Sequence, residues 1–299
     1  MKSRTLIFIS LILIFLATCL VVMWLNSESR FILNSELNKQ PSTVALPVTS
    51  PFLIALNSQR VLFESGSEDE SSDPYWWLDS GGLMYFNLNE GKTVQGSLPK
   101  NSEWRIKYGN KNQEDTDNGY HPQNIFRLVS RNKWHDFRQE VYFMINKDEL
   151  SDSPNRNESN GLLLFNRYVD SNNLYYTGIR VDGAAVIKKK VNGVYYTLDY
   201  KPVISGKYDR VLNPNLLPKK EWIGIRSEIT TDDFGVVEIR LYTDIGRKGE
   251  WILVATAKDD GQSNGSVIDS NAFVGIRTDF MDVAFIDYKV ENVGILKLN

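Results

Sequence analysis

The chain has 299 residues, of which 42% are hydrophobic and 24% charged, an ordinary globular composition with enough length for one large core. Its formal net charge of −3 provides no basic excess, which argues against nucleic-acid binding. Cys19 is the only cysteine, so the chain that follows it has no disulfide, no cysteine nucleophile and no cysteine-ligated metal.

The N-terminus carries a long apolar run. Leu6 to Leu25 is a stretch of twenty uncharged residues that follows Lys2 and Arg4. At a rise of about 1.5 Å per residue, a helix of this length spans about 30 Å, the thickness of the hydrocarbon core of a bilayer. We therefore predict that residues 1–25 form a cytoplasmic stub and a transmembrane anchor. Because basic residues flanking a span stay in the cytoplasm, the rest of the chain is expected to lie outside the membrane.

A cleaved signal peptide is the alternative. Its apolar region would be about 7–15 residues long, with small residues at a cleavage site after it. Here the apolar run continues through Val21 to Leu25 and no such site follows, which favours a retained anchor. Without Lys2 and Arg4, the exterior part has 32 basic and 37 acidic residues, a net charge of −5.

The remaining chain divides into a linker and one large domain. Residues 26–50 are polar, rich in Ser and Asn, and include Pro41 and Pro47, which is typical of a tether. Residues 51–299 contain many short β-forming runs, separated by Gly, Asn and Asp turns, and no long helical period. This pattern predicts an all-β fold, a jelly-roll sandwich of two antiparallel sheets.

Four expected strands between residues 161 and 200 are the clearest part of this pattern. Asp182-Gly183 and Asn192-Gly193 separate the later strands, and such dipeptides are the strongest short hairpin signals in a sequence. Two-residue loops at these sites, together with a looser turn between the first two strands, set the register of the four strands. The expected pairs are Tyr168 with Leu174, Val181 with Ala184, and Val191 with Val194.

This register assigns side chains to the two faces of the sheet, because residues opposite each other in paired strands share a face. One face is mostly aliphatic and is predicted to face the core. The other face carries Arg167, Tyr175, Lys190 and Tyr195 in one row, with Lys188 in the next. We therefore predict an outward stripe in which cations alternate with phenols.

The chain also resembles a known family. Phe273-Val274-Gly275-Ile276-Arg277-Thr278 and the following run Val283 to Val290 resemble the closing hairpin of concanavalin A-like lectin/glucanase sandwiches. Laminin-G-like and 3-keto-disaccharide hydrolase-like members share this pattern, and the four-strand segment resembles their central part. The resemblance spans roughly Arg60 to Val293. It implies a concanavalin A-like jelly roll in which the outward face of one sheet forms a glycan groove.

The resemblance makes the stripe a candidate carbohydrate site. Tyr rings stack on sugar faces, and Arg or Lys can hold a uronate or a sulfate. An exposed strand face normally carries these same residue types without any ligand, and that alternative stays open. The candidate ligand-binding residues are Arg167, Tyr175, Lys188, Lys190 and Tyr195.

Paired acids and histidines provide little sign of catalysis. A retaining glycosidase needs two carboxyl groups about 5–5.5 Å apart, whereas Glu238 and Asp244 are six residues apart on one expected strand. A Ser-His-Asp triad would have to use His121 or His135, and neither lies in a nucleophile motif or a metal-binding spacing.

An acidic turn is a weak candidate for Ca²⁺. Asp115 and Asp117 place oxygen ligands at alternating positions, like the first half of a calcium loop, but the later Glu of that pattern is missing. Ordinary turns formed by Asp and Asn explain the segment equally well. We therefore expect no cofactor, with Ca²⁺ as the one candidate.

The sequence predicts a membrane-anchored, extracytoplasmic, lectin-like sandwich that binds carbohydrate at the cell surface without catalysis. One alternative is a polysaccharide lyase or glycoside hydrolase acting on acidic glycans, with Tyr175 or Tyr195 abstracting a proton. The other is a structural or adhesion module that binds protein partners.

Overall fold

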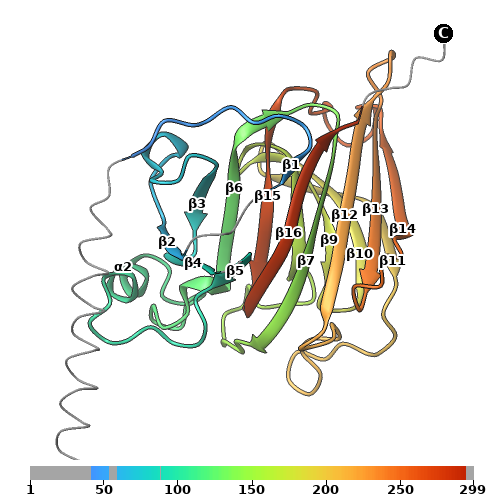
Figure 1. Cartoon of the computed structure of the whole chain (residues 1–299). Helices are drawn as coiled ribbons and strands as arrows, with labels where there is room; N and C mark the ends of the chain where they lie inside the picture. Colours follow the sequence, from blue (N-terminus) through green and yellow to red (C-terminus); the bar gives the residue numbers. More distant parts are fainter. Residues whose placement is uncertain (1–41, 54–58, 88, 294–299) are drawn as a thin grey trace, which may run out of the picture. The chain divides into compact units, whose positions relative to one another are not determined.

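The structure, a computed structural model, describes residues 42–53, 59–87 and 89–293 (Figure 1). The predicted anchor Leu6 to Leu25 and most of the predicted linker lie outside these residues. In the described ranges, no helix is long and apolar enough to cross a membrane. Residues 42–50 lie against the sandwich, where the Thr43 N–H donates to Ser71 O at 2.9 Å and the Leu46 N–H to Pro74 O at 3.1 Å.

The described chain forms two antiparallel sheets, and the predicted all-β sandwich is confirmed. The nine-stranded sheet has the order β14 (Ile252–Asp259), β13 (Val237–Ile245), β12 (Trp222–Thr231), β7 (Phe137–Asp148), β16 (Met281–Asn292), β5 (Glu90–Thr93), β4 (Leu83–Asn87) and β2 (Arg60–Phe63), with β1 (Phe52–Leu53) paired to β16. The seven-stranded sheet has the order β11 (Val194–Pro202), β10 (Ala184–Val191), β9 (Asn173–Arg180), β8 (Gly161–Asp170), β15 (Ala272–Asp279), β6 (Ile125–Trp134) and β3 (Trp76–Ser80).

Helical structure in the described ranges is short. It comprises α2 (Glu103–Lys111) and the 3-10 turns η1 (Glu68–Glu70) and η2 (Pro122–Asn124). Helix α2 lies near β2 and β4, at one side of the sandwich (Figure 1). Trp104 and Tyr108 of α2 are buried in a small cluster with Leu83, Val94 and Leu98, which attaches the helix to the sheet.

The main core lies between the two sheets. It gathers the inward residues of both, including Val141 and Phe143 from β7 and Leu162 and Leu164 from β8, all fully buried. Alternate residues of a strand point to opposite faces of its sheet. The even alternation of β7 therefore places its charged residues outward, as an antiparallel sheet with one solvated face requires, while Gln139 lies inward and is hydrogen-bonded to Asn166 and Tyr288.

The seven-stranded sheet also has an apolar region on its outer face, around β8. Leu163 and Phe165 of β8 alternate with core residues, and they form a second buried cluster with Tyr168, Leu174, Tyr176, Val186, Val129 and Phe273. This explains why β8 reads as a nearly continuous apolar run. In a strand with a solvated outer face, apolar and polar residues would alternate along the sequence.

Gly275, in the motif that carries the family resemblance, lies flush against the neighbouring strand β6. A Cβ on this residue would be 2.2 Å from Leu128 O, far inside the van der Waals distance. Only glycine therefore allows β15 to pair with β6 on one side and β8 on the other at this point.

The last hairpin of the four-strand segment follows the prediction. Val191 pairs with Val194, and Asn192 and Gly193 have φ values of 50° and 83°. Positive φ at both positions is the type I′ conformation that Asn-Gly favours.

The two earlier turns differ from the prediction by one residue. Strand β9 ends at Arg180 and β10 begins at Ala184, so the loop has three residues, closed by a bond of 2.9 Å from the Gly183 N–H to Arg180 O. At the other end of β9, Tyr175 pairs with Asn166. The predicted pairs Val181 with Ala184 and Tyr168 with Leu174 are therefore wrong.

The two one-residue shifts cancel across β9. Strands β10 and β11, and β8 as far as Asn166, keep the faces that the sequence predicted, whereas β9 is turned over, because a shift of one residue moves every side chain to the opposite face. Tyr176 consequently occupies the outward position predicted for Tyr175, and Tyr175 enters the core.

Candidate functional site

The predicted stripe is divided between the two faces of the sheet. Lys188, Lys190 and Tyr195 face outward, where they line hollows in the surface. Arg167 and Tyr175 are each 0% exposed, so their predicted outward position is wrong.

Arg167 points inward because β8 contains a β-bulge. The pairing of β8 with β9 is irregular between Asn166 and Asp170, and Arg167 has a φ of 48°. This conformation directs both Asn166 and Arg167 into the sandwich, whereas strict alternation would send them to opposite faces.

The buried guanidinium of Arg167 is fully used in structural contacts. It donates to His135 O at 3.1 Å, to Ile268 O at 2.8 Å and to Thr231 Oγ1 at 2.6 Å. It also forms ion pairs with Asp136 at 3.0 Å and Asp269 at 3.2 Å. His135 bridges the same two carboxylates, at 3.1 Å and 2.9 Å. Arg167 therefore has no free hydrogen-bonding group for a ligand.

Tyr175 is likewise a core residue. Its hydroxyl donates to Asp259 and accepts from the Ile268 N–H at 3.2 Å. Lys189 forms an ion pair of 2.6 Å with the same carboxylate of Asp259. Burial raises the pKa of the Tyr175 phenol, and the adjacent Asp259 raises it further, so the hydroxyl is fixed as a neutral donor.

The outer face of the seven-stranded sheet carries two adjoining hollows, which we call the outer groove. The larger has a volume of about 410 Å³ and the smaller about 220 Å³. Four residues line both, one each from β6, β9, β11 and β15: Arg127, Tyr176, Tyr195 and Arg277. Lys188 lines the larger hollow, and Lys190 and Tyr168 line the smaller one.

Tyr195 lies at the junction of the two hollows. Its ring packs edge-on against Tyr176, with 6.1 Å between the ring centroids, and Lys190 Nζ lies 4.6 Å from its centroid. The phenol is 49% exposed, so it is available to a ligand. Burial alone would raise the pKa of Tyr195, but Arg277 and Lys190 outweigh this effect and lower the pKa below the ordinary value of a tyrosine.

Within the part of the chain that the structure describes, two of the four cations in the groove lie close to a carboxylate, and the other two do not. Arg277 donates to Asp279 at 2.8 Å, and Arg127 lies 3.4 Å from Asp79. Among the described residues, neither Lys188 nor Lys190 has a carboxylate within ion-pair distance, and Lys190 Nζ donates to the Ser171 carbonyl at 2.8 Å. Burial and the nearby Arg180 lower the pKa of Lys188, which is the direction expected for a cation without a counter-charge.

One wall of the larger hollow is acidic and rich in amides. Asp279 is 2% exposed, and its Oδ2 has no hydrogen-bond partner among the described residues, while its Oδ1 holds Arg277. Asn155, Asn157 and Asn160 lie along the same hollow. The exposed Asn155 and the half-buried Asn157 can offer amide donors and acceptors to hydroxyl groups of a ligand, whereas the Asp279 oxygen is buried.

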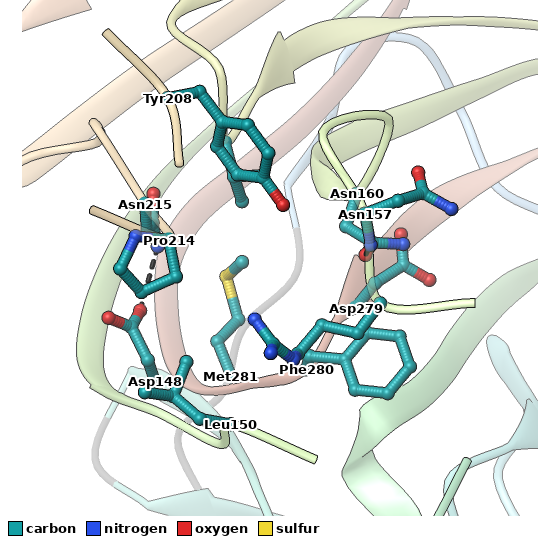
Figure 2. A pocket seen from close by; sticks show the side chains of 12 residues that line it. Asp148, Leu150, Asn157, Asn160, Tyr208, Pro214, Asn215, Asp279, Phe280 and Met281 are labelled. Carbon is teal, nitrogen blue, oxygen red and sulfur yellow. Dashed lines mark hydrogen bonds between the residues drawn. The ribbon is translucent and has the colours of Figure 1, made fainter. Parts of the chain in front are cut away.

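A smaller cavity lies against Asp279 and Phe280, which line both it and the larger hollow. Figure 2 shows it enclosed by Tyr208, Met281 and the pair Asn215 and Asp148, which share a hydrogen bond of 2.7 Å. Its volume is about 10 Å³, room for one water molecule, so it is not a ligand site.

The candidate calcium residues have other contacts. Asp115 Oδ1 accepts from Ser153 Oγ at 2.6 Å and from Asn155 Nδ2 at 3.0 Å. Asp117 has a φ of 50° and lies 3.9 Å from His121 Nε2. Within the described ranges, no three His, Cys, Asp or Glu side chains are grouped so as to hold a metal ion.

The sequence did not identify Arg127, Tyr176, Arg277 and Asp279 as site residues. Tyr176 was missed because of the register shift in β9. Arg277 and Asp279 belong to the closing hairpin of the family resemblance, but β15 pairs with β8 across more than a hundred residues of sequence. No local pattern predicts that pairing.

Comparisons with known proteins concern the fold. Neither protein-family models nor curated protein sequences give a match to this chain. Solved structures do resemble it, among them carbohydrate-binding module CBM66 from Bacillus subtilis, with 14% identity, a TM-score of 0.43, and coverage of 73% of this chain and 95% of that one.

Two further structures are similar. A β-glucanase from Bacillus licheniformis has 11% identity, a TM-score of 0.43, and coverage of 83% of this chain and 100% of the other. The exoplasmic/lumenal domain of VIP36 in its Ca²⁺-bound form has 10% identity, a TM-score of 0.37, and coverage of 82% and 94%. Likeness at this level says nothing about what this chain binds.

Proposed function

We propose that this protein binds an acidic carbohydrate in the outer groove, without catalysis. The observation that carries the proposal is the composition of the groove, where an exposed phenol lies among four cations and two of these, Lys188 and Lys190, have no acidic partner among the described residues. Tyr195 offers a ring face and a hydroxyl, and Lys188 and Lys190 offer charge.

The groove has the chemistry of a sugar site. Tyrosine supplies apolar area together with a polar group, which matches the apolar face and hydroxyl rim of a pyranose. The Asn155 and Asn157 side chains, which line the larger hollow, provide acceptors and donors for hydroxyl groups.

The charges favour an anionic sugar over a neutral one. The chain carries a net charge of −3, yet the groove concentrates Arg127, Arg277, Lys188 and Lys190. A uronate carboxylate or a sulfate would form charge-assisted hydrogen bonds with the two unpaired lysines, and these are stronger than neutral ones.

Titration of the full-length chain with a uronate polymer, a sulfated polymer and a neutral glucan tests the proposal. We expect the double variant Lys188→Ala/Lys190→Ala to bind the acidic polymers about tenfold or more weakly, since each charged hydrogen bond contributes roughly 1.5–3 kcal/mol. Lys258→Ala is the matched control, because this exposed lysine lies on β14 in the other sheet. Equal affinity in both variants, or no binding of any polymer by the folded protein, would refute the proposal.

A lyase acting on the same acidic polymer is the second candidate. The lowered pKa of Tyr195 beside Arg277 favours it, because a phenolate can abstract the proton next to a uronate carboxylate that a cation neutralises. The ultraviolet absorbance of an unsaturated uronate product, lost in Tyr195→Phe, would establish this reaction. Binding of the polymer without formation of this product would exclude the lyase and support the non-catalytic binding function.

Attachment to the membrane is part of the same proposal and rests on Leu6 to Leu25 alone. A retained anchor predicts that the protein stays with membranes after alkaline extraction. It also predicts that externally added protease cleaves the domain on intact cells. Recovery of a shortened, freely released chain would favour a cleaved signal peptide.

A further inference from the structure

Three side chains from separate loops meet at a site outside the outer groove. Ser97 follows β5, His121 precedes η2, and Glu149 follows β7. Ser97 Oγ lies 3.2 Å from His121 Nε2, and His121 Nδ1 lies 3.2 Å from Glu149 Oε2. A nucleophile, a base and an acid that orients the base have this order and these distances in serine hydrolases.

The burial of the three groups suits the same roles. Ser97 is exposed, so an acyl donor can reach its hydroxyl. His121 is 8% exposed and Glu149 is 6% exposed, which shields the contact between them from water. A carboxylate in such surroundings interacts more strongly with an imidazolium than an exposed one does.

The surrounding residues fix the histidine and the glutamate. The His121 N–H donates to Thr116 O at 2.9 Å, and the Glu149 N–H donates to Phe280 O at 2.8 Å. Lys147 Nζ holds the other carboxylate oxygen of Glu149 at 2.8 Å. Asp117 also lies near the ring, 3.9 Å from Nε2.

The contact between His121 and Glu149 has the distance of an ion pair but not the direction of a hydrogen bond, so Nδ1 is a buried atom without a hydrogen-bond partner. A small rotation of the ring would align it. Catalytic hydrogen bonds in ligand-free enzymes are often poorly aligned and tighten when the substrate binds.

A donor for a developing oxyanion is also present. No described residue accepts a hydrogen bond from the Ser97 N–H, although the preceding Gly96 N–H donates to Asp282 at 2.7 Å and the following Leu98 N–H donates to Tyr120 O at 2.8 Å. The N–H of the nucleophile itself is one of the oxyanion donors in serine proteases.

We propose that Ser97, His121 and Glu149 hydrolyse a carboxylic ester. Ser97 Oγ attacks the carbonyl carbon, its proton passes to His121 Nε2, and the carbonyl electron pair moves onto the oxygen. The tetrahedral species collapses by breaking the bond to the alkoxide, which takes the proton from His121. Water then attacks the acyl-Ser97 ester by the same route and releases the carboxylic acid. Glu149 is a positioning residue that stabilises the protonated imidazole.

This activity goes beyond binding in the outer groove and does not depend on it. Because Ser97 is exposed, the ester can be carried on a large molecule as well as a small one. p-Nitrophenyl acetate and a fluorophosphonate probe therefore test the full-length chain directly, since both react with an activated serine whatever the natural alcohol is.

We expect the wild-type chain to hydrolyse p-nitrophenyl acetate and to be labelled by the fluorophosphonate. Ser97→Ala and His121→Ala should lose both, whereas Ser263→Ala, which removes another exposed serine hydroxyl, should keep both. Near-ultraviolet circular dichroism checks that each variant is folded. An unlabelled wild-type protein, or equal hydrolysis by wild type and Ser97→Ala, would overturn the proposal.

Glu149→Gln separates positioning from simple support of the fold. Loss of the carboxylate leaves the imidazolium that forms in the transition state without its counter-charge, so kcat should fall while KM stays nearly unchanged. This fall should be roughly a hundredfold or more, by analogy with loss of a triad acid. An unchanged kcat in a folded Glu149→Gln protein would show that Glu149 has no part in the reaction.

Discussion

Replacement of Arg167 by alanine distinguishes the inward position of this residue from an outward one. In the structure, the guanidinium supplies donors to His135 O, Ile268 O and Thr231 Oγ1 and a counter-charge to Asp136 and Asp269. If Arg167 faced outward, its replacement would change the free energy of unfolding very little, because surface substitutions usually change it by less than about 0.5 kcal/mol.

The magnitude follows from what the substitution leaves behind. Breaking a buried ion pair by removing one partner costs about 3–5 kcal/mol. The side chains of Asp136 and Asp269 are 21% and 38% exposed, so water can partly solvate them after the change. We therefore expect the lower end, about 3 kcal/mol, which is a large part of the roughly 5–15 kcal/mol that stabilises a typical domain.

Urea unfolding of the full-length chain measures this loss as a fall in the midpoint with an unchanged slope, since the surface exposed on unfolding stays nearly the same. Lys190→Ala is the matched control, because that cation faces the outer groove and has no acidic partner among the described residues. Stability of Arg167→Ala within about 0.5 kcal/mol of wild type would refute the inward orientation and the bulge that causes it.

Three further outcomes follow from single residues. The phenol of Tyr195 should ionise below the ordinary pKa of 10, seen as a tyrosinate absorbance step that Tyr195→Phe lacks. Because the pKa of Tyr195 is lowered in the folded state, ionisation of its phenol stabilises the fold as the pH rises from that lowered pKa to 10. Below the lowered pKa the phenol is neutral in both states and makes no such contribution. An absorbance step at or above pH 10 would contradict this prediction. Gly119→Ala should destabilise the protein far more than Gly235→Ala, because both have φ near +80° but a Cβ at position 119 would lie 2.0 Å from a backbone carbonyl oxygen, whereas position 235 is open. Similar unfolding midpoints for the two alanine variants would argue against this packing. Lys189→Ala should lower the free energy of unfolding by about 3–5 kcal/mol, because it leaves Asp259 buried without its cation. A decrease below about 1 kcal/mol would show that the pair is not buried.

The all-β architecture could be predicted from sequence because it depends on local signals. Short β-forming runs and turn residues recur through the chain, and Asn192-Gly193 specifies its own hairpin by requiring positive φ at two successive positions. The outward faces of Lys188, Lys190 and Tyr195 follow from this one turn, since β10 and β11 are joined by it.

The position of Arg167 and Tyr175 depended on features that no local pattern specifies. Asp182-Gly183 is compatible with a two-residue or a three-residue loop, and the packing of β9 against its neighbours selects the longer one. The bulge at Arg167 directs the guanidinium to Asp136 and Asp269, which are distant in sequence and meet it inside the sandwich.

The sequence by itself determined the strands, most of their faces and the cationic, phenolic character of β10 and β11, because these depend on turn chemistry and alternation. Only the tertiary structure placed Arg277 and Asp279 beside Tyr195, and Ser97 beside His121, because strand pairing and loop convergence across long stretches of chain decide those neighbours. The cost of closing such loops rises only slowly with their length, so residue spacing carries almost no information about which distant groups will meet.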